Sequence, residues 1–170
     1  MTKKELKKQL FLAMPLSTCI LFIFFDSIPF YFFSQYSFNT QFGLTILYCW
    51  ICMNPDLLRP IVILFLGLLI DLFHNYLFGF TSVLVSLILF IQKRDTSNLI
   101  GKNFKITWLR FFIFILIVNI LSSIVFKLLN SDLIINSFEF FYTIVLTSMF
   151  FPFIFYFTYY LNNKIVYYAE

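Results

Sequence analysis

Apolar residues in this chain are gathered into six long runs, which charged residues and prolines separate from one another. A helix that crosses a bilayer of about 30 Å needs about 20 residues, so a chain of 170 residues holds at most about six or seven such spans. The second and fourth runs are shorter than this and must recruit flanking residues. The sequence therefore predicts an all-α integral membrane protein, one domain over residues 1–170, with six transmembrane helices at Leu10–Phe33, Phe42–Met53, Pro60–Leu77, Phe80–Gln92, Ile106–Leu129 and Phe138–Leu161.

The composition favours the same class of protein. Apolar residues make up 61% of the chain and charged residues 12%, whereas a soluble protein is nearer to about half and about a quarter. Six spans leave no room for a separate soluble catalytic domain. The net charge of +4 comes from clusters beside the apolar runs, which is typical of cytoplasmic loops, so we do not expect nucleic acid as a partner.

The basic residues predict the orientation, because loops on the cytoplasmic side carry an excess of lysine and arginine. The three loops predicted to lie outside, near residues 34–41, 75–79 and 130–137, contain no lysine or arginine. Trp50 and Trp108 fall near the inner boundaries, where indole rings prefer to lie. We expect both termini in the cytoplasm, with these basic residues on the same side: Lys3, Lys4, Lys7, Lys8, Arg59, Lys93, Arg94, Lys102, Lys105 and Lys164.

The start of the chain is similar to a signal peptide, because a lysine-rich segment precedes an apolar run. No small-x-small cleavage site follows, and the run continues past Cys19 to Phe33. We therefore expect the first span to be retained as a membrane helix.

Asp71 is the polar residue that is most costly to place in a bilayer. It follows ten consecutive residues without a polar side chain, which puts it about 15 Å from the inner boundary. A carboxylate near the bilayer centre costs about 2.5–3.5 kcal/mol on insertion scales, so we expect it to face protein and either to have a partner or to hold its proton. Gly67, His74 and Asn75 lie on the same helical face, four residues before, three after and four after it.

This face has three interpretations. It is a structural polar contact or helix cap between the third and fourth spans, a contact surface for a partner's helix, or a proton or substrate site. One acid and one histidine are too few for a metal site, which normally has three or four protein ligands.

A second polar stripe lies on the fifth run, where Asn119, Ser122 and Ser123 are spaced three and four residues apart. Small polar residues at this spacing allow helices to approach and to hydrogen-bond across their interface. The stripe is interpreted as packing within the chain or, alternatively, as part of the same partner surface.

Charged residues near the ends of the runs are assigned to interfaces and turns. Asp26 precedes Pro29 near the outer end of the first run and is expected to mark the water interface. Pro55 predicts a compact inner turn between the second and third runs. Asp56 and Arg59 within that turn are close enough in sequence to pair, which contributes little at an exposed position.

Motifs for catalysis are absent from the sequence. It contains no glycine-rich phosphate loop, no H-E-x-x-H, no G-x-S-x-G and no paired carboxylates within a predicted span. Cys49 and Cys52 form a C-x-x-C, but they lie in an apolar run with no cation nearby to stabilise a thiolate, so packing is favoured over redox chemistry. We expect a protein that is not an enzyme and that has no cofactor.

The stretch from Tyr48 to Gln92 resembles the MreD family of rod shape-determining proteins. The resemblance lies in Y-C-W-I-C-M-N-P-D-L-L-R-P, then F-L-G-L-L-I-D-L-F, then L-F-G-F-T-S-V-L, and it covers about a quarter of the chain. The family typically shows a span that ends near a proline, a Gly-Leu-Leu-x-Asp segment and a glycine that opens the next helix. Those positions here are Pro55, Gly67, Leu68, Leu69, Asp71 and Gly79.

The resemblance implies a non-enzymatic scaffold of the bacterial elongation machinery, located in the inner membrane. Such a protein binds MreC, a bitopic periplasmic protein, and through it communicates with MreB filaments and the wall synthase complex. It implies a fold similar to the six-helix substrate-binding subunits of energy-coupling-factor transporters. The basic inner loops would face filaments or membrane lipid. The alternative function is a solute-binding subunit of a vitamin-type transporter.

Overall fold

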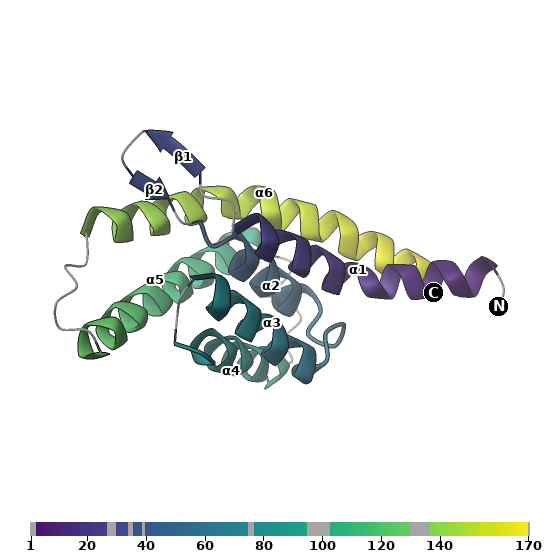
Figure 1. The fold of residues 1–170 in the computed structure, drawn as a ribbon. Coiled ribbons are helices and arrows are strands. Elements are labelled where there is room, and N and C mark those ends of the chain that lie inside the picture. The colour runs from purple at the N-terminus through teal and green to yellow at the C-terminus, as the bar shows by residue number, and fades with distance from the viewer. Residues whose placement is uncertain are drawn as a thin grey trace.

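The computed structural model describes residues 3–26, 30–33, 36–38, 40–74, 77–94, 103–129 and 137–169. In this part of the chain six helices are formed (Figure 1): α1 (Lys3–Asp26), α2 (Phe42–Met53), α3 (Pro60–His74), α4 (Phe80–Arg94), α5 (Phe104–Leu129) and α6 (Ser137–Ala169). A short antiparallel β-hairpin, β1 (Phe30–Phe33) and β2 (Tyr36–Phe38), lies between α1 and α2. The predicted helical fold with six helices is therefore confirmed, with the β-hairpin as an addition.

The outer surface of the helices is strongly apolar. Two of the described helices contain a segment long and apolar enough to cross a membrane, Phe104–Val125 in α5 and Phe141–Tyr167 in α6. Large apolar side chains are exposed on α3, α4 and α6 as well, among them Ile61, Phe90 and Phe153. Exposed apolar surface of this extent favours contact with lipid or with another protein.

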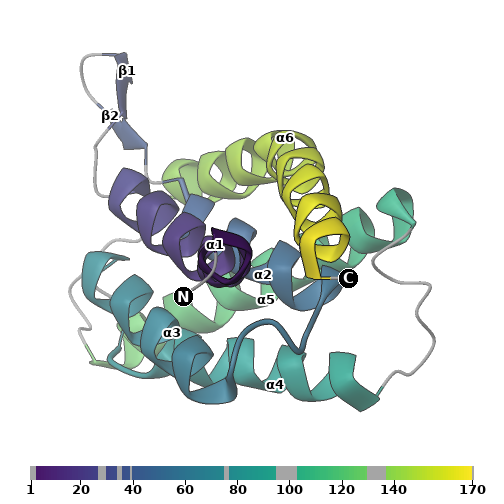
Figure 2. The ribbon, with the colours of Figure 1, turned by 90° about the vertical axis from the view of Figure 1, so that its right-hand side faces the viewer.

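Helix α2 lies at the centre of the fold, between α1, α3 and α6 (Figure 2). All ten residues from Gly43 to Cys52 are buried, as expected for a helix that is apolar on every side. Trp50 is fully buried and donates a hydrogen bond from Nε1 to Oγ1 of Thr18, 3.1 Å away. The Trp50 indole therefore lies in the protein core, whereas Trp108 is 40% exposed.

Two helical hairpins, α1 with α2 and α3 with α4, contain the most closely packed helix pairs. A glycine permits the close approach in each. A Cβ on Gly67 would lie 2.6 Å from Cα of Ser82 in α4, and a Cβ on Gly43 would lie 2.6 Å from Cγ1 of Ile23 in α1. The two glycines therefore fix how near the helices of each hairpin can come.

Helix α5 packs on α2 and α6 mainly through aromatic rings. The rings of Phe111 and Phe151 are stacked with centroids 4.4 Å apart, and Tyr48 of α2 stacks on Phe114 at 5.6 Å. Beyond this contact α5 and α6 diverge toward the end of α5 and the beginning of α6 (Figure 1).

The first predicted span is wrong at its outer end. It was expected to continue as a helix to Phe33, but α1 ends at Asp26 and β1 begins at Phe30. Pro29 stands in this part of the sequence, and a proline disrupts a helix because it lacks a backbone N–H. The aromatic residues that follow favour extended structure.

The other helix boundaries lie close to the predicted ones, with two exceptions. Helix α3 ends at His74 and not at Leu77. Helix α6 continues to Ala169, past the predicted end at Leu161, and Lys164 Nζ lies 4.4 Å from the centroid of the Tyr160 ring in this last part.

Candidate functional site

Asp71 caps the N-terminus of the next helix. Its side chain is buried, with the residue 1% exposed, and its two carboxylate oxygens accept hydrogen bonds from the backbone N–H groups of Gly79 and Thr81, each at 2.9 Å. The first N–H groups of a helix have no partner within the helix, and a negative charge there is favoured by the helix dipole. Gly79 has a φ of 93°, which other residues rarely adopt. Of the three interpretations of Asp71, the helix cap is the one for which the structure supplies contacts.

Asp26 does the same for α2. Its carboxylate accepts hydrogen bonds from the N–H groups of Phe42 at 2.7 Å and Gly43 at 2.6 Å, and its side chain is 0% exposed. Gln41, the residue before α2, makes no capping hydrogen bond with its side chain. The carboxylate of Asp26, which was expected to mark the water interface, is therefore buried within the protein. The sequence offered one sign of this cap: Asp26 lies near the end of one apolar run, and Gly43 lies at the start of the next.

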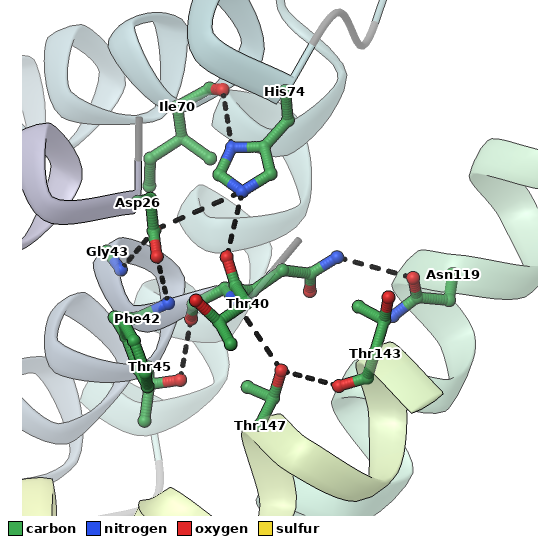
Figure 3. Close-up of polar contacts among 11 residues, drawn as sticks. Asp26, Thr40, Phe42, Gly43, Thr45, Ile70, His74, Asn119, Thr143 and Thr147 are labelled. Carbon is green, nitrogen blue, oxygen red and sulfur yellow. Dashed lines mark hydrogen bonds and ion pairs between the residues drawn. The ribbon is translucent and has the colours of Figure 1, made fainter. Parts of the chain in front are cut away.

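His74 reaches the first hairpin and not the cap at Asp71. Its Nδ1 lies 3.1 Å from the carbonyl oxygen of Ile70, and its Nε2 lies 3.3 Å from the carbonyl oxygen of Thr40 (Figure 3). The same Nε2 is 4.0 Å from Oδ2 of Asp26, an ion-pair distance. Asn75, predicted for the same face, lies outside the described residues.

A polar cluster at the start of α2 joins α5 and α6. Gln41 donates from Nε2 to Oδ1 of Asn119 at 3.2 Å, and its backbone N–H donates to Oγ1 of Thr147 at 3.4 Å (Figure 3). Asn119 is thus a contact between helices. The hydroxyls of Ser122 and Ser123 donate within α5, to the carbonyl oxygen of Asn119 at 2.9 Å and 2.8 Å.

The turn before α3 lies at the opposite end of that helix. Oδ1 of Asp56 is 3.3 Å from Nζ of Lys93 in α4. The acid therefore pairs with this lysine, whereas the sequence had suggested a pair with Arg59. Pro55 lies in the turn, and the carbonyl oxygen of the exposed Arg59 accepts the N–H of Ile63 in the first turn of α3. Both partners of the ion pair are solvated, so it contributes little to stability.

An apolar groove runs between α1 and α6, and we call it the α1–α6 groove. It has a volume of about 290 Å³. Its lining contains no polar surface and consists of Phe22, Phe25, Phe42, Phe150, Phe153, Ile154 and Phe157. Such a surface can bind an apolar helix or acyl chain through van der Waals contacts.

The cysteines belong to the core, where Cys19, Cys49 and Cys52 are buried free thiols. Over the described ranges, no group of three or more His, Cys, Asp or Glu residues is arranged to hold a metal ion.

The structure divides the predicted site residues among three places. Gly67, Asp71 and Gly79 lie at the α3–α4 contact, His74 and Asn119 lie near the start of α2, and the turn before α3 is separate from both. No family model matches the chain, and no curated protein or solved structure shows significant similarity to it.

Proposed function

We propose that this chain is a non-enzymatic scaffold of the MreD type in the bacterial inner membrane. In this proposal its six helices span the bilayer, both termini lie in the cytoplasm, and the protein binds the single transmembrane helix of an MreC-type partner. Through that partner it helps to regulate MreB filaments and the enzymes that build the lateral cell wall. The resemblance from Tyr48 to Gln92 supports this assignment at the level of sequence.

The observation that carries the proposal is that two buried carboxylates cap helices. Asp26 and Asp71 each accept two backbone N–H groups from the helix that follows. A carboxylate engaged in this way fixes the position of a helix terminus. Both acids therefore act in holding helices in a fixed arrangement, which is the property that a binding scaffold requires.

The α1–α6 groove is the surface that we assign to the partner helix. Transmembrane helices associate by close packing, since lipid is as apolar as their side chains. The groove offers aromatic rings from three helices, and Phe153 at its edge is 71% exposed. An apolar helix could pack its side chains between these rings.

The proposal is tested by co-expressing the chain with the MreC-type protein of the same organism and purifying the complex in mild detergent. We expect the two proteins to co-purify and Phe153→Ala to weaken their affinity about tenfold, the loss typical of an interface residue worth about 1.4 kcal/mol. Phe90→Ala in α4 is the matched control, because Phe90 is 69% exposed but lies outside the groove. Absence of a complex with the wild-type chain would contradict the proposal.

The polar cluster around Gln41 favours a second candidate, a solute-binding subunit of a vitamin-type transporter. Gln41, Asn119 and Thr147 bring amide and hydroxyl groups of three helices together. Mass spectrometry of the purified protein distinguishes the two functions. A retained small molecule, or a paired ATPase and coupling subunit, would support transport, whereas a retained single-span protein would support the scaffold.

A further inference from the structure

The surroundings of His74 indicate the protonation state of its ring. Nδ1 faces the carbonyl oxygen of Ile70 at 3.1 Å, and Nε2 faces the carbonyl oxygen of Thr40 at 3.3 Å and a carboxylate oxygen of Asp26 at 4.0 Å. A carbonyl oxygen can only accept a hydrogen bond. A neutral imidazole has one N–H, so one of its nitrogens would direct a lone pair at a carbonyl oxygen. The imidazolium has two N–H groups and can donate to both.

The surroundings of Asp26 indicate the complementary charge. Its carboxylate accepts the N–H groups of Phe42 and Gly43, and the hydroxyl of Thr40 also hydrogen-bonds to it. Burial disfavours the ionised form of this carboxylate, and these three donors act against that cost. The side chains of Asp26 and His74 are 0% and 6% exposed, so the two charges face each other with little solvent between them.

Asp26 is a carboxylate at ion-pair distance from the ring. Thr40 and Gln41, which precede α2, are uncharged. Asp71 lies three residues earlier on the same helix, but its two oxygens are taken up by N–H groups at the start of α4.

We infer that His74 is held as an imidazolium and forms with Asp26 and Thr40 a protonation-dependent clasp, which fastens the first hairpin to the end of α3. The ring bridges the carbonyl of Ile70 in its own helix to the carbonyl of Thr40 and the carboxylate that caps α2. Loss of its proton removes one of the two hydrogen bonds and the ion pair together. The clasp is therefore stable while the ring carries both protons and is weakened when it loses one. This inference does not depend on the identity of a partner protein.

Nitrogen NMR on the intact protein in lipid nanodiscs tests the inference, because His74 is the single histidine of the chain. Protein grown with ¹⁵N-labelled histidine reports on this ring alone. The two ring nitrogens resonate close together in an imidazolium and far apart in a neutral ring. We expect the imidazolium pattern at neutral pH. A neutral pattern in the wild-type protein would overturn the inference.

Two variants show whether Asp26 is the partner that holds the charge. Asp26→Asn removes the opposite charge, and we expect the ring to become neutral under the same conditions. Asp71→Asn is the matched control, since it alters the equivalent cap on the second hairpin, and we expect the imidazolium pattern to remain. An imidazolium pattern in Asp26→Asn, or its loss in Asp71→Asn, would contradict the clasp.

Thermal unfolding measures the contribution of the clasp without requiring NMR of a poorly folded variant. We expect His74→Gln to lower the melting temperature by about 6–12 °C, as for loss of one partner of a buried ion pair. In the double variant with Asp26→Asn, the loss should be smaller than the sum of the two single losses. Additive losses would refute the clasp.

Discussion

In both helical hairpins, the N-terminus of the second helix is capped by an acid of the first helix, but only one of the two hairpins uses a residue from outside itself. In both, an acid in the last turn of one helix accepts two N–H groups at the start of the next, and a glycine allows the helices to approach. In the second hairpin the acid and the first capped residue are eight positions apart, and the contacts stay within α3, α4 and their turn. In the first hairpin the acid and the first capped residue are sixteen positions apart, with a β-hairpin between them. His74 of α3, which belongs to the second hairpin, contacts the capping acid. The first hairpin therefore depends on the second.

The largest expected effect comes from removing the caps. Asp71→Leu leaves the buried N–H of Thr81 and the half-buried N–H of Gly79 without an acceptor. At about 1–3 kcal/mol for each, we expect a loss of about 3–4 kcal/mol in the free energy of unfolding. Asp26→Leu should cost more, because it also removes the ion-pair partner of His74. Denaturation in detergent micelles measures both. Equal losses, or a smaller loss for Asp26→Leu, would contradict the dependence of the first hairpin on the second.

Substitution of the two close-contact glycines by alanine gives the next largest loss of stability. The two hairpins should differ, because the added Cβ contacts different atoms in each. Gly67→Ala places a methyl group 2.6 Å from a backbone atom of Ser82. Gly43→Ala places it 2.6 Å from a side-chain atom of Ile23, and the nearest backbone atom there is 3.1 Å away. We expect losses of about 2–3 kcal/mol for Gly67→Ala and about 1 kcal/mol for Gly43→Ala. The same denaturation assay serves here, and the reverse order would show that the α3–α4 contact is less rigid than its geometry implies.

Gly79→Ala isolates the cost of the turn that opens α4. A Cβ there would have no heavy atom within 4 Å outside its chain neighbours, so the positive φ of 93° is the source of the expected loss. We expect about 1–2 kcal/mol in the free energy of unfolding, measured by denaturation. Gly79→Asn should recover part of it, since asparagine tolerates positive φ better than alanine. A Gly79→Asn variant as unstable as Gly79→Ala would indicate a different role for this glycine.

The ion pair between Asp56 and Lys93 gives the smallest effect. Lys93→Ala breaks this contact, which links the turn before α3 to the end of α4. Because both side chains are solvated, we expect a change in the free energy of unfolding below about 0.5 kcal/mol. A loss of several kcal/mol would show that the inner end of the second hairpin is held as firmly as the capped end.

Local sequence patterns were sufficient to find Asp71 but not Asp26. A single acid after ten apolar residues stands out, because its surroundings are set by its own helix. Asp26 lies at the end of an apolar run beside a proline, where an acid is usually solvated. Its burial is decided by the start of α2, sixteen residues later, and that contact leaves no periodic signal in the sequence.

His74 shows a second limit of the same kind. Helical periodicity places it on the face of Asp71, but its ring meets Thr40 and Asp26, which belong to another hairpin. Helix boundaries were predictable where a proline or charge lies next to them, as at Pro60. The extension of α6 was missed because Asn162, Asn163 and Lys164 indicate the end of an apolar span, although polar residues can continue a helix.

Site-specific photo-crosslinking in native membranes tests the scaffold proposal at the α1–α6 groove. A photoreactive amino acid is placed at Phe153 in one variant and at Phe90 in α4 in the other, since both positions are exposed and apolar. We expect a cross-link to a single-span protein with a periplasmic coiled coil from position 153 and none to that protein from position 90. Cross-links to lipid alone from both positions, or to a coupling subunit and its ATPase, would contradict the proposal.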